Sequence, residues 1–345
     1  MYLQQLLLHI FQKFNGQRSE SAAYHLLRGK RSGQTIQDVG TFGLHEYFCI
    51  IPKLSKDNYK DAFDQLIENG WIFYDENKML QLSTRGKDVL VKSPTFHFNG
   101  WFYRGNERTF FKRLSLVVQT LSHIHAKDWR FIPIQKEEEI QQWVKNFLKH
   151  HAYKNVDFRL QLREEIEVSF KQLQISEESK QIAMLRLTGY QLTGWTWQQL
   201  AREFDCSELD TQLMLVELLH IWLDCITNAS NPYPLLHQIS ENIRIELLLT
   251  DSTKKTVDLY ERGYSLEQIA YMRHLKSSTI EDHFVEMAMT DPRFPLVQFI
   301  KEEDVQKVIK VLNETGSKRL KVIREQLPQL SYFQIRLVIA AKGGK

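Results

Sequence analysis

Hydrophobic residues near the start of the chain recur with the period of an α-helix. Between Leu3 and Asn15 the apolar positions lie three or four residues apart, which places them on one helix face, and Gly16 follows as a stop. Further helices are predicted at Ser19–Leu27 and Lys56–Asn69. The segment GKRSGQTIQD (29–38) is interpreted as a polar stretch that separates the second helix from the elements after it.

A different pattern appears between residues 71 and 82. The apolar runs WIFY (71–74) and MLQL (79–82) flank the polar turn DENK (75–78), and this arrangement predicts two short β-strands joined as a hairpin. Helices followed by a β-hairpin are typical of a winged helix. Residues 1–92 are therefore predicted to form a winged-helix domain.

The middle of the chain is bounded by two segments that have neither the hydrophobic period of a helix nor that of a strand. KSPTFHFNGW (92–101) and NASNPYP (228–234) are rich in residues that break helices and strands, so we place boundaries there. Residues 102–228 are predicted to form a central helical domain. Thr196 and Gln199 have the spacing of a capping box, and the helices around them predict a unit that resembles a helix-turn-helix.

The last part of the chain, residues 250–342, alternates short helical patterns with turns of three or four residues, which predicts tandem helix-turn-helix units. Ser265 with Gln268, Ser278 with Glu281 and Ser331 with Gln334 have capping-box spacing. The predicted fold class is thus mainly α, with one small β-hairpin. The helices of this domain are predicted at Thr253–Arg262, Ser265–Leu275, Ser278–Met289, Glu302–Asn313, Ser317–Leu327 and Ser331–Ala340.

The composition is that of a globular protein. Of the 345 residues 43% are hydrophobic, yet no apolar run approaches the roughly 20 residues that span a membrane. The three cysteines, Cys49, Cys206 and Cys225, are distant and odd in number, which suits a reducing compartment. The N-terminus lacks the features of a signal peptide. We expect a cytoplasmic, nucleoid-associated protein that does not contact membranes.

Motifs for catalysis are missing from the sequence. The GKRSG segment near Gly29 lacks the residue order of a phosphate-binding loop, and no GxSxG motif occurs. The acidic runs at 137–139 and 164–165 are interpreted as solvated helix faces, and paired histidines lack further ligands at metal-binding spacing. We therefore expect no enzyme, no cofactor, no metal site and no small-molecule substrate.

Charge is distributed unevenly along the chain. The net charge is +2 in residues 1–95, −2 in residues 96–250 and +3 in residues 251–345. Because Lys and Arg contacts with phosphate supply most nucleic-acid affinity, the two ends hold the candidate binding residues. One candidate group lies in the last predicted helices, where the alternative interpretation is a solvated basic helix. It consists of Lys318, Arg319, Lys321, Arg324, Tyr332, Gln334 and Arg336.

A second candidate group surrounds the start of the helix predicted from Ser278. Glu281, Asp282 and Glu286 lie on the same helix and are expected to repel phosphates, so a phosphate contact at the helix start or a protein interface is favoured over base readout. The group consists of Arg273, Lys276, Ser277, Ser278 and Thr279.

A third candidate group flanks the second predicted helix of the winged domain, and ordinary surface charge is its alternative. It consists of Arg18, Arg28, Lys30 and Arg31. The aromatic and basic run WFYRGNERTFFKRL (101–114) is interpreted as a helix that packs its rings inward rather than as a site for stacking single-stranded bases.

Two stretches of the C-terminal part, TVDLYERGYSLEQIAYMRHLKSSTIEDHF and KVIREQLPQLSYFQIRLVIA, resemble the helicase-associated helix-turn-helix domain of some RecQ-type helicases, including the Werner syndrome helicase. The whole chain, with LLRGKRSGQTIQD near its start, resembles the YpbB-type proteins of bacteria. The N-terminal part is similar to the winged RQC module of RecQ enzymes. In that module the hairpin, or wing, contacts the ends of DNA duplexes. Here the hairpin tip, residues 75–78, is short and acidic, so the resemblance does not imply that this hairpin separates DNA strands.

These resemblances imply an accessory protein that binds duplex, forked or single-stranded DNA and supports a separately encoded RecQ-type helicase in DNA repair or recombination. Two alternatives remain open at this point. One is a transcription regulator that reads a specific sequence, and the other is an adaptor that binds the helicase without contacting DNA.

Overall fold

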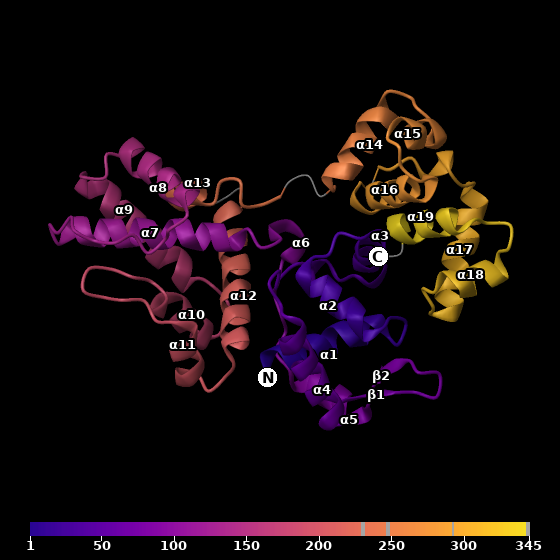
Figure 1. Ribbon diagram of the computed structural model, residues 1–345, viewed down its shortest axis with the longest axis horizontal. Helices are drawn as coiled ribbons and strands as arrows, with labels where there is room; N and C mark the ends of the chain where they lie inside the picture. Colours follow the sequence, from indigo (N-terminus) through magenta and orange to yellow (C-terminus); the bar gives the residue numbers. More distant parts are fainter. Residues whose placement is uncertain (229–231, 246–248, 292, 343–345) are drawn as a thin grey trace. The chain divides into compact units, whose positions relative to one another are not determined.

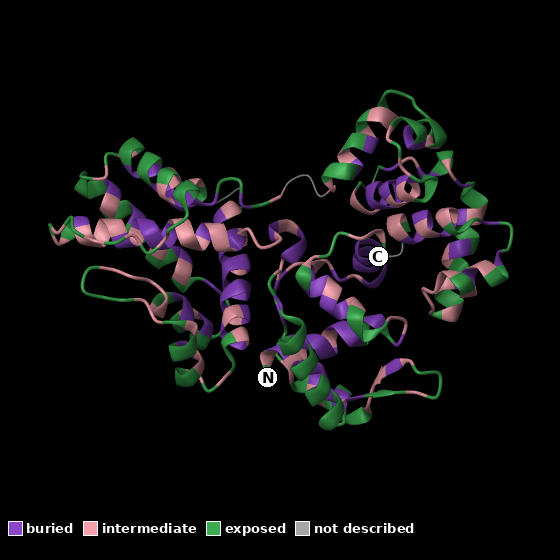
Figure 2. Cartoon of the chain, in the orientation of Figure 1, coloured by how far each residue is buried: buried purple, intermediate pink, exposed green. Residues whose placement is uncertain are grey.

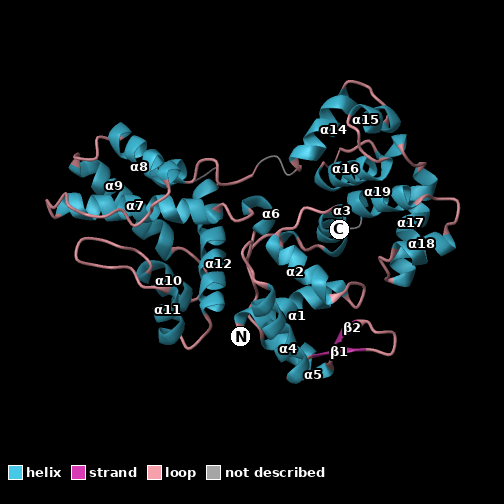
Figure 3. Cartoon of the chain, viewed as in Figure 1, coloured by secondary structure: helices cyan, strands magenta, loops and turns pink. Residues whose placement is uncertain are grey.

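The computed structural model describes residues 1–228, 232–245, 249–291 and 293–342. Within these residues the chain forms nineteen α-helices, two short 3₁₀ helices and one two-stranded sheet (Figure 3). This confirms the mainly α fold class. In the same part of the chain, no helix is both long enough and apolar enough to cross a membrane.

The chain divides into two compact units that do not follow the order of the sequence. Unit 1 comprises residues 1–6, 50–52 and 94–246, and unit 2 comprises residues 7–49, 53–93 and 247–345. Unit 2 thus combines the predicted winged-helix segment with the predicted helix-turn-helix segment. The three consecutive domains expected from the sequence stay a prediction.

Unit 1 is built around the long helices α7 and α12 (Figure 1). In its core the rings of Phe110 and Trp222 meet edge to face with centroids 5.5 Å apart, and Trp222 Nε1 donates a hydrogen bond of 2.9 Å to Ser169 Oγ. The helices of this unit are α6 (Gly100–Tyr103), α7 (Glu107–His125), α8 (Glu138–His150), α9 (Val156–Lys171), α10 (Glu177–Leu185), α11 (Trp197–Glu203), α12 (Glu208–Thr227) and α13 (Pro234–Ile239).

Two local predictions for unit 1 are confirmed. The capping box at the start of α11 is present, because Thr196 and Gln199 each bond the other's backbone amide. In the aromatic and basic run, the rings of Trp101, Tyr103 and Phe110 are buried, as expected for a helix that packs its rings inward.

Unit 2 contains the remaining elements, with α1 (Tyr2–Phe14) entering it at residue 7. The N-terminal elements are α2 (Glu20–Arg28), α3 (Gly33–Phe42), η1 (His45–Tyr47), α4 (Lys56–Glu68), β1 (Ile72–Tyr74), β2 (Leu80–Leu82) and α5 (Thr84–Lys92). The C-terminal elements are α14 (Asp251–Glu261), α15 (Leu266–Met272), α16 (Ser277–Thr290), η2 (Leu296–Gln298), α17 (Glu302–Thr315), α18 (Leu320–Gln326) and α19 (Tyr332–Lys342).

The predicted hairpin is present as an antiparallel pair. Ile72 pairs with Leu82, and Tyr74 pairs with Leu80. Helix α5 follows directly and packs closely on the residue before the first strand, since a β-carbon at Gly86 would lie 2.0 Å from the carbonyl oxygen of Trp71. The order of helices, hairpin and final helix is therefore as expected, while the assignment of this segment as a winged helix stays a prediction.

The segment 29–38 was interpreted as a polar stretch, and this interpretation is wrong from Gly33 onward. Helix α3 begins there, with Ser32 as its N-cap, and every residue from Thr35 to Phe42 is buried (Figure 2). The buried carboxylate of Asp38 accepts a hydrogen bond of 2.7 Å from Arg18 Nε. Glycine and polar side chains give this helix a weak intrinsic tendency to form, so tertiary contacts stabilise it.

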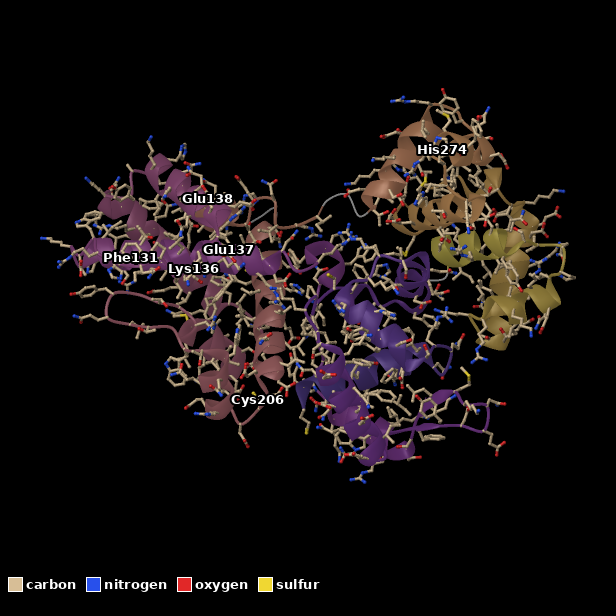
Figure 4. All side chains as sticks on the ribbon, in the orientation of Figure 1. Phe131, Lys136, Glu137, Glu138, Cys206 and His274 are labelled. Atoms are coloured by element: carbon tan, nitrogen blue, oxygen red, sulfur yellow. The ribbon has the colours of Figure 1, made fainter. Side chains whose placement is uncertain are left out.

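Helices α14, α15 and α16 form the first C-terminal helix-turn-helix. Ser265 and Gln268 make the predicted capping box at the start of α15. The second predicted box is wrong, because α16 begins at Ser277 after Lys276, whose side chain makes no cap hydrogen bond. The turn between α15 and α16 contains His274, which adopts a left-handed backbone with φ of 52° (Figure 4).

Candidate nucleic-acid interface

Helices α3 and α16 lie side by side in unit 2 (Figure 1), and the contacts of two glycines show that they run parallel. A β-carbon at Gly33 would lie 2.5 Å from Asp282 Oδ2, and one at Gly40 would lie 2.5 Å from Met289 Sδ. The two contacts are seven residues apart on both helices, which fixes the parallel orientation. Glycine at these positions permits the close approach, since any larger residue would displace the facing side chain.

The parallel orientation brings two helix N-termini to the same end of the pair. Each helix N-terminus carries roughly half a positive elementary charge and free backbone N–H groups, a combination that attracts phosphate. Lys30 and Arg31 precede α3, Lys276 precedes α16, and all three side chains are exposed. Ser277 and Ser278, in the first turn of α16, are also exposed. The fold therefore joins parts of the second and third candidate groups.

The side of α16 next to this end is occupied by the protein itself. Arg336 of α19 forms an ion pair with Asp282 and donates a hydrogen bond of 3.0 Å from Nε to Gln37 Oε1 of α3. Arg336 therefore links three helices and neutralises the carboxylate nearest the interface. Because α3 and α19 both pack along α16, this helix presents its first turn to solvent rather than a whole face.

Two of the three carboxylates of α16 are engaged within the protein itself. Asp282 is paired with Arg336. Glu286 is buried and accepts hydrogen bonds from the backbone amide of Thr250, at 2.6 Å, and from the hydroxyl of Thr253. It thereby fixes the start of α14. Glu281, which is partly exposed, is the remaining acidic residue of the expected three.

Arg273 is engaged inside the helix-turn-helix. Its guanidinium donates hydrogen bonds to the backbone oxygen and hydroxyl of Ser252, at 2.8 and 3.0 Å, and to the hydroxyl of Thr256. Burial lowers the pKa of this group. In this structure Arg273 holds α14 against the turn that precedes α16, while the neighbouring Lys276 extends into solvent.

Two members of the C-terminal candidate group contact the N-terminal segment. The ammonium group of Lys318 donates a hydrogen bond to the carbonyl oxygen of Thr41, and the backbone amide of Lys318 donates one of 2.7 Å to Gln17 Oε1. Arg319 Nη2 donates a hydrogen bond of 3.0 Å to the carbonyl oxygen of Gly16. These cations dock the start of α18 onto the N-terminal helices, and burial lowers the pKa of Lys318.

The other members of that group divide between exposed and structural positions. Lys321 is exposed, and the guanidinium of Arg324 stacks over the exposed ring of Tyr332 at 4.5 Å. Gln334 and Ser331 each accept a hydrogen bond from the other's backbone amide at the start of α19, as expected from the sequence. Gln334 also donates a hydrogen bond of 2.9 Å to the carbonyl oxygen of Phe299. Lys321, Arg324 and Tyr332 thus remain available as a separate, smaller contact.

The third group gains one residue that the sequence analysis did not select. Burial lowers the pKa of His25, and the charges of Lys30, Arg28 and Lys56 lower it further. Lys56 is exposed and opens α4. Its position directly after the N-cap Ser55 was visible in the sequence, but its effect on His25 depends on the fold.

Arg18 has a structural role beside this group. Its Nε donates to Asp38 at 2.7 Å, and its guanidinium lies 4.8 Å from the centre of the Phe42 ring. It therefore satisfies the buried carboxylate of α3. The predicted site residues remain untested as DNA contacts, and the exposed cations that directly precede the paired helices are Lys30, Arg31 and Lys276.

The stability of unit 2 is expected to depend on pH through His283 of α16. Burial, and secondarily the charge of Arg273, lowers the pKa of His283 from 6.5 to about 4, while Thr256 shares a hydrogen bond of 2.8 Å with Nδ1. The unfolded chain therefore binds the proton more tightly, and acidification from about pH 6.5 to about pH 4 should cost up to about 3 kcal/mol.

Urea denaturation of the chain at about pH 7.5 and about pH 4.5 measures this effect. His283→Gln keeps a hydrogen-bonding side chain but cannot titrate, so the variant should lose part of the pH dependence. An equal loss of stability in both proteins on acidification would contradict the assignment to His283.

Comparison with known protein families identifies the C-terminal helices as a known type of domain. Residues 252–339 match the family model of a helix-turn-helix domain, and the matched region spans α14 to most of α19. The chain is thus a helix-turn-helix protein, and this domain indicates DNA binding. No solved structure matches the chain significantly.

One relative covers nearly the whole sequence. The chain is 31% identical over 345 residues to the protein YpbB of Bacillus subtilis (strain 168), an alignment that includes 98% of this chain and 97% of that protein. The chain belongs to the YpbB family. This confirms the resemblance to YpbB-type proteins.

Proposed function

We propose that the chain is a non-enzymatic DNA-binding accessory protein that contacts phosphates through the paired N-termini of α3 and α16. The observation that carries the proposal is the parallel packing of these helices, fixed by Gly33 and Gly40, which gathers two helix dipoles and exposed cations at one end. Phosphate contacts of this kind supply affinity and position the protein on DNA.

The geometry favours recognition of DNA structure over recognition of a particular sequence. Reading bases requires a helix face that enters the major groove. The sides of α16 are covered by α3 and α19, so only its first turn is available, and backbone contacts carry no direct sequence information. This supports an accessory role more than that of a sequence-specific regulator.

We further propose that the partner is a separately encoded RecQ-type helicase and that the pair acts in DNA repair or recombination in the cytoplasm, at the nucleoid. The resemblance of the two C-terminal stretches to helicase-associated helix-turn-helix domains supports this proposal. A DNA-binding module on a separate chain would increase the local concentration of the motor at its substrate when the two proteins associate.

Co-purification with the RecQ-type helicase of the same organism, followed by unwinding assays with and without this chain, tests the partnership. We expect a complex and a change in unwinding of forked DNA. A chain that binds DNA with strong salt dependence but neither associates with the helicase nor alters unwinding would retain the DNA-binding role and refute the partnership. Association without any salt-dependent DNA binding would instead refute the phosphate contact.

A further inference from the structure

Unit 1 contains a cavity of about 250 Å³ that none of the proposed DNA contacts uses. It lies between α7, α12 and the segment from Arg186 to Trp197. Arg108, Lys112 and Arg186 line it, and no carboxylate is among the described residues of its wall. The wall thus carries three basic side chains, of which Arg108 and Lys112 also form ion pairs with carboxylates outside the wall.

Arg186 has the least compensated charge in this cavity. Its Nη1 donates to the carbonyl oxygen of Trp195, and its guanidinium lies 4.4 Å from the centre of the Trp197 ring. Its Nε is buried without a hydrogen-bond partner in the described structure, and burial lowers the pKa of the group. A guanidinium in the wall of a cavity binds an anion strongly when the two groups come into hydrogen-bond contact.

The two other cations are compensated to different degrees. Lys112 donates a hydrogen bond of 2.6 Å to Glu137, which lies beside α7 and outside the cavity wall (Figure 4). Arg108 forms an ion pair with Glu107, with Nε and Oε1 3.8 Å apart, and its buried Nε makes no hydrogen bond within the described residues. The guanidinium groups of Arg108 and Arg186 both belong to the cavity wall.

We propose that this cavity binds a small molecule that carries a phosphate group and has about the size of a mononucleotide. A phosphate monoester has roughly two negative charges near neutral pH and three acceptor oxygens, which suits two guanidinium groups. The apolar side chains of Phe111 and Trp197 in the wall supply contacts for the remainder of the ligand. The volume lies near the lower end of small-molecule sites, about 300 Å³.

Calorimetric titration of the full chain with adenosine monophosphate, adenosine and inorganic phosphate tests the proposal. Adenosine monophosphate should bind, and adenosine should bind at least about tenfold more weakly because it lacks the charged group. Failure of both adenosine monophosphate and phosphate to bind at millimolar concentration would overturn the proposal. Equal affinity for adenosine and its monophosphate would overturn it as well.

A charge variant locates the ligand. Gln212 of α12 lines the cavity and is partly exposed, so Gln212→Glu places a negative charge in the wall with almost no change in shape. It should raise the Kd for adenosine monophosphate at least about tenfold. Gln142→Glu makes the same change on the exposed surface of α8 and should leave the Kd unchanged. Without ligand, both variants should unfold at the same temperature as the parent chain.

The result is separable from the proposed DNA binding in unit 2. Gln212→Glu should weaken the binding of adenosine monophosphate but leave the affinity for DNA within about twofold of that of the parent chain. An unchanged Kd for adenosine monophosphate in Gln212→Glu would overturn the location. Loss of DNA affinity in this variant would show that the cavity belongs to the nucleic-acid interface, and would also overturn the proposal of a separate small-molecule site.

Discussion

Reversing the charges of Lys30, Arg31 and Lys276 together is expected to weaken binding to duplex DNA by at least about 100-fold at about 100 mM salt. The parallel packing of α3 and α16 places these exposed side chains at one end of the helix pair, where two helix dipoles already favour anions. Each lost phosphate contact should also reduce the slope of log affinity against log salt by about one.

Fluorescence anisotropy with a labelled duplex over a series of salt concentrations measures both quantities. The matched control is a triple reversal of Lys60, Lys87 and Lys310, which are exposed in the same unit on α4, α5 and α17. It changes the net charge equally and should lower affinity only several-fold through long-range effects. Equal losses in the two variants would mean that net charge, rather than this end of the helix pair, determines binding.

Replacing Glu286 by Ala is expected to destabilise the helix-turn-helix by about 3 kcal/mol. The buried carboxylate accepts hydrogen bonds from the amide and hydroxyl of Thr250 and from the hydroxyl of Thr253. Its removal leaves these donors without an acceptor in a site that excludes water, and it releases the start of α14 from α16. Hydrogen exchange of the α14 amides should accelerate accordingly.

Glu281→Ala is the control for this prediction, because Glu281 lies on the same helix but is partly exposed. Its effect should stay within about 0.5 kcal/mol. Glu286→Gln should fall between the two, since the amide keeps one acceptor oxygen. Similar exchange rates in Glu286→Ala and Glu281→Ala would show that the hydrogen bonds of Glu286 contribute little to stability.

Several elements of this protein followed directly from sequence patterns. The capping boxes at Thr196 and Ser265 formed as predicted, because the groups that make them lie within four residues of each other. The hairpin at residues 72–82 likewise depends on a short loop and neighbouring apolar residues. The box expected at Ser278 did not form, because α16 starts one residue earlier and Lys276 takes the cap position.

Other features depended on partners distant in the sequence. Side-chain roles were hard to predict for charged residues, since an exposed cation and one that bonds a distant carbonyl look alike in a sequence. Lys318 and Arg319 contact residues about 300 positions away, at Thr41 and Gly16. Glu286, expected to repel DNA, is buried against the cap of α14.

The sequence by itself determined the mainly helical fold, the hairpin and the helix-turn-helix pattern, because short-range periodicity and capping specify each of them. Only the tertiary structure decided that α3 is a buried helix and that it runs parallel to α16. Its polar and glycine-rich sequence has little tendency to form a helix alone, and its burial in unit 2, with the close approach of Gly33 and Gly40 to α16, stabilises it. The candidate interface exists because of that packing.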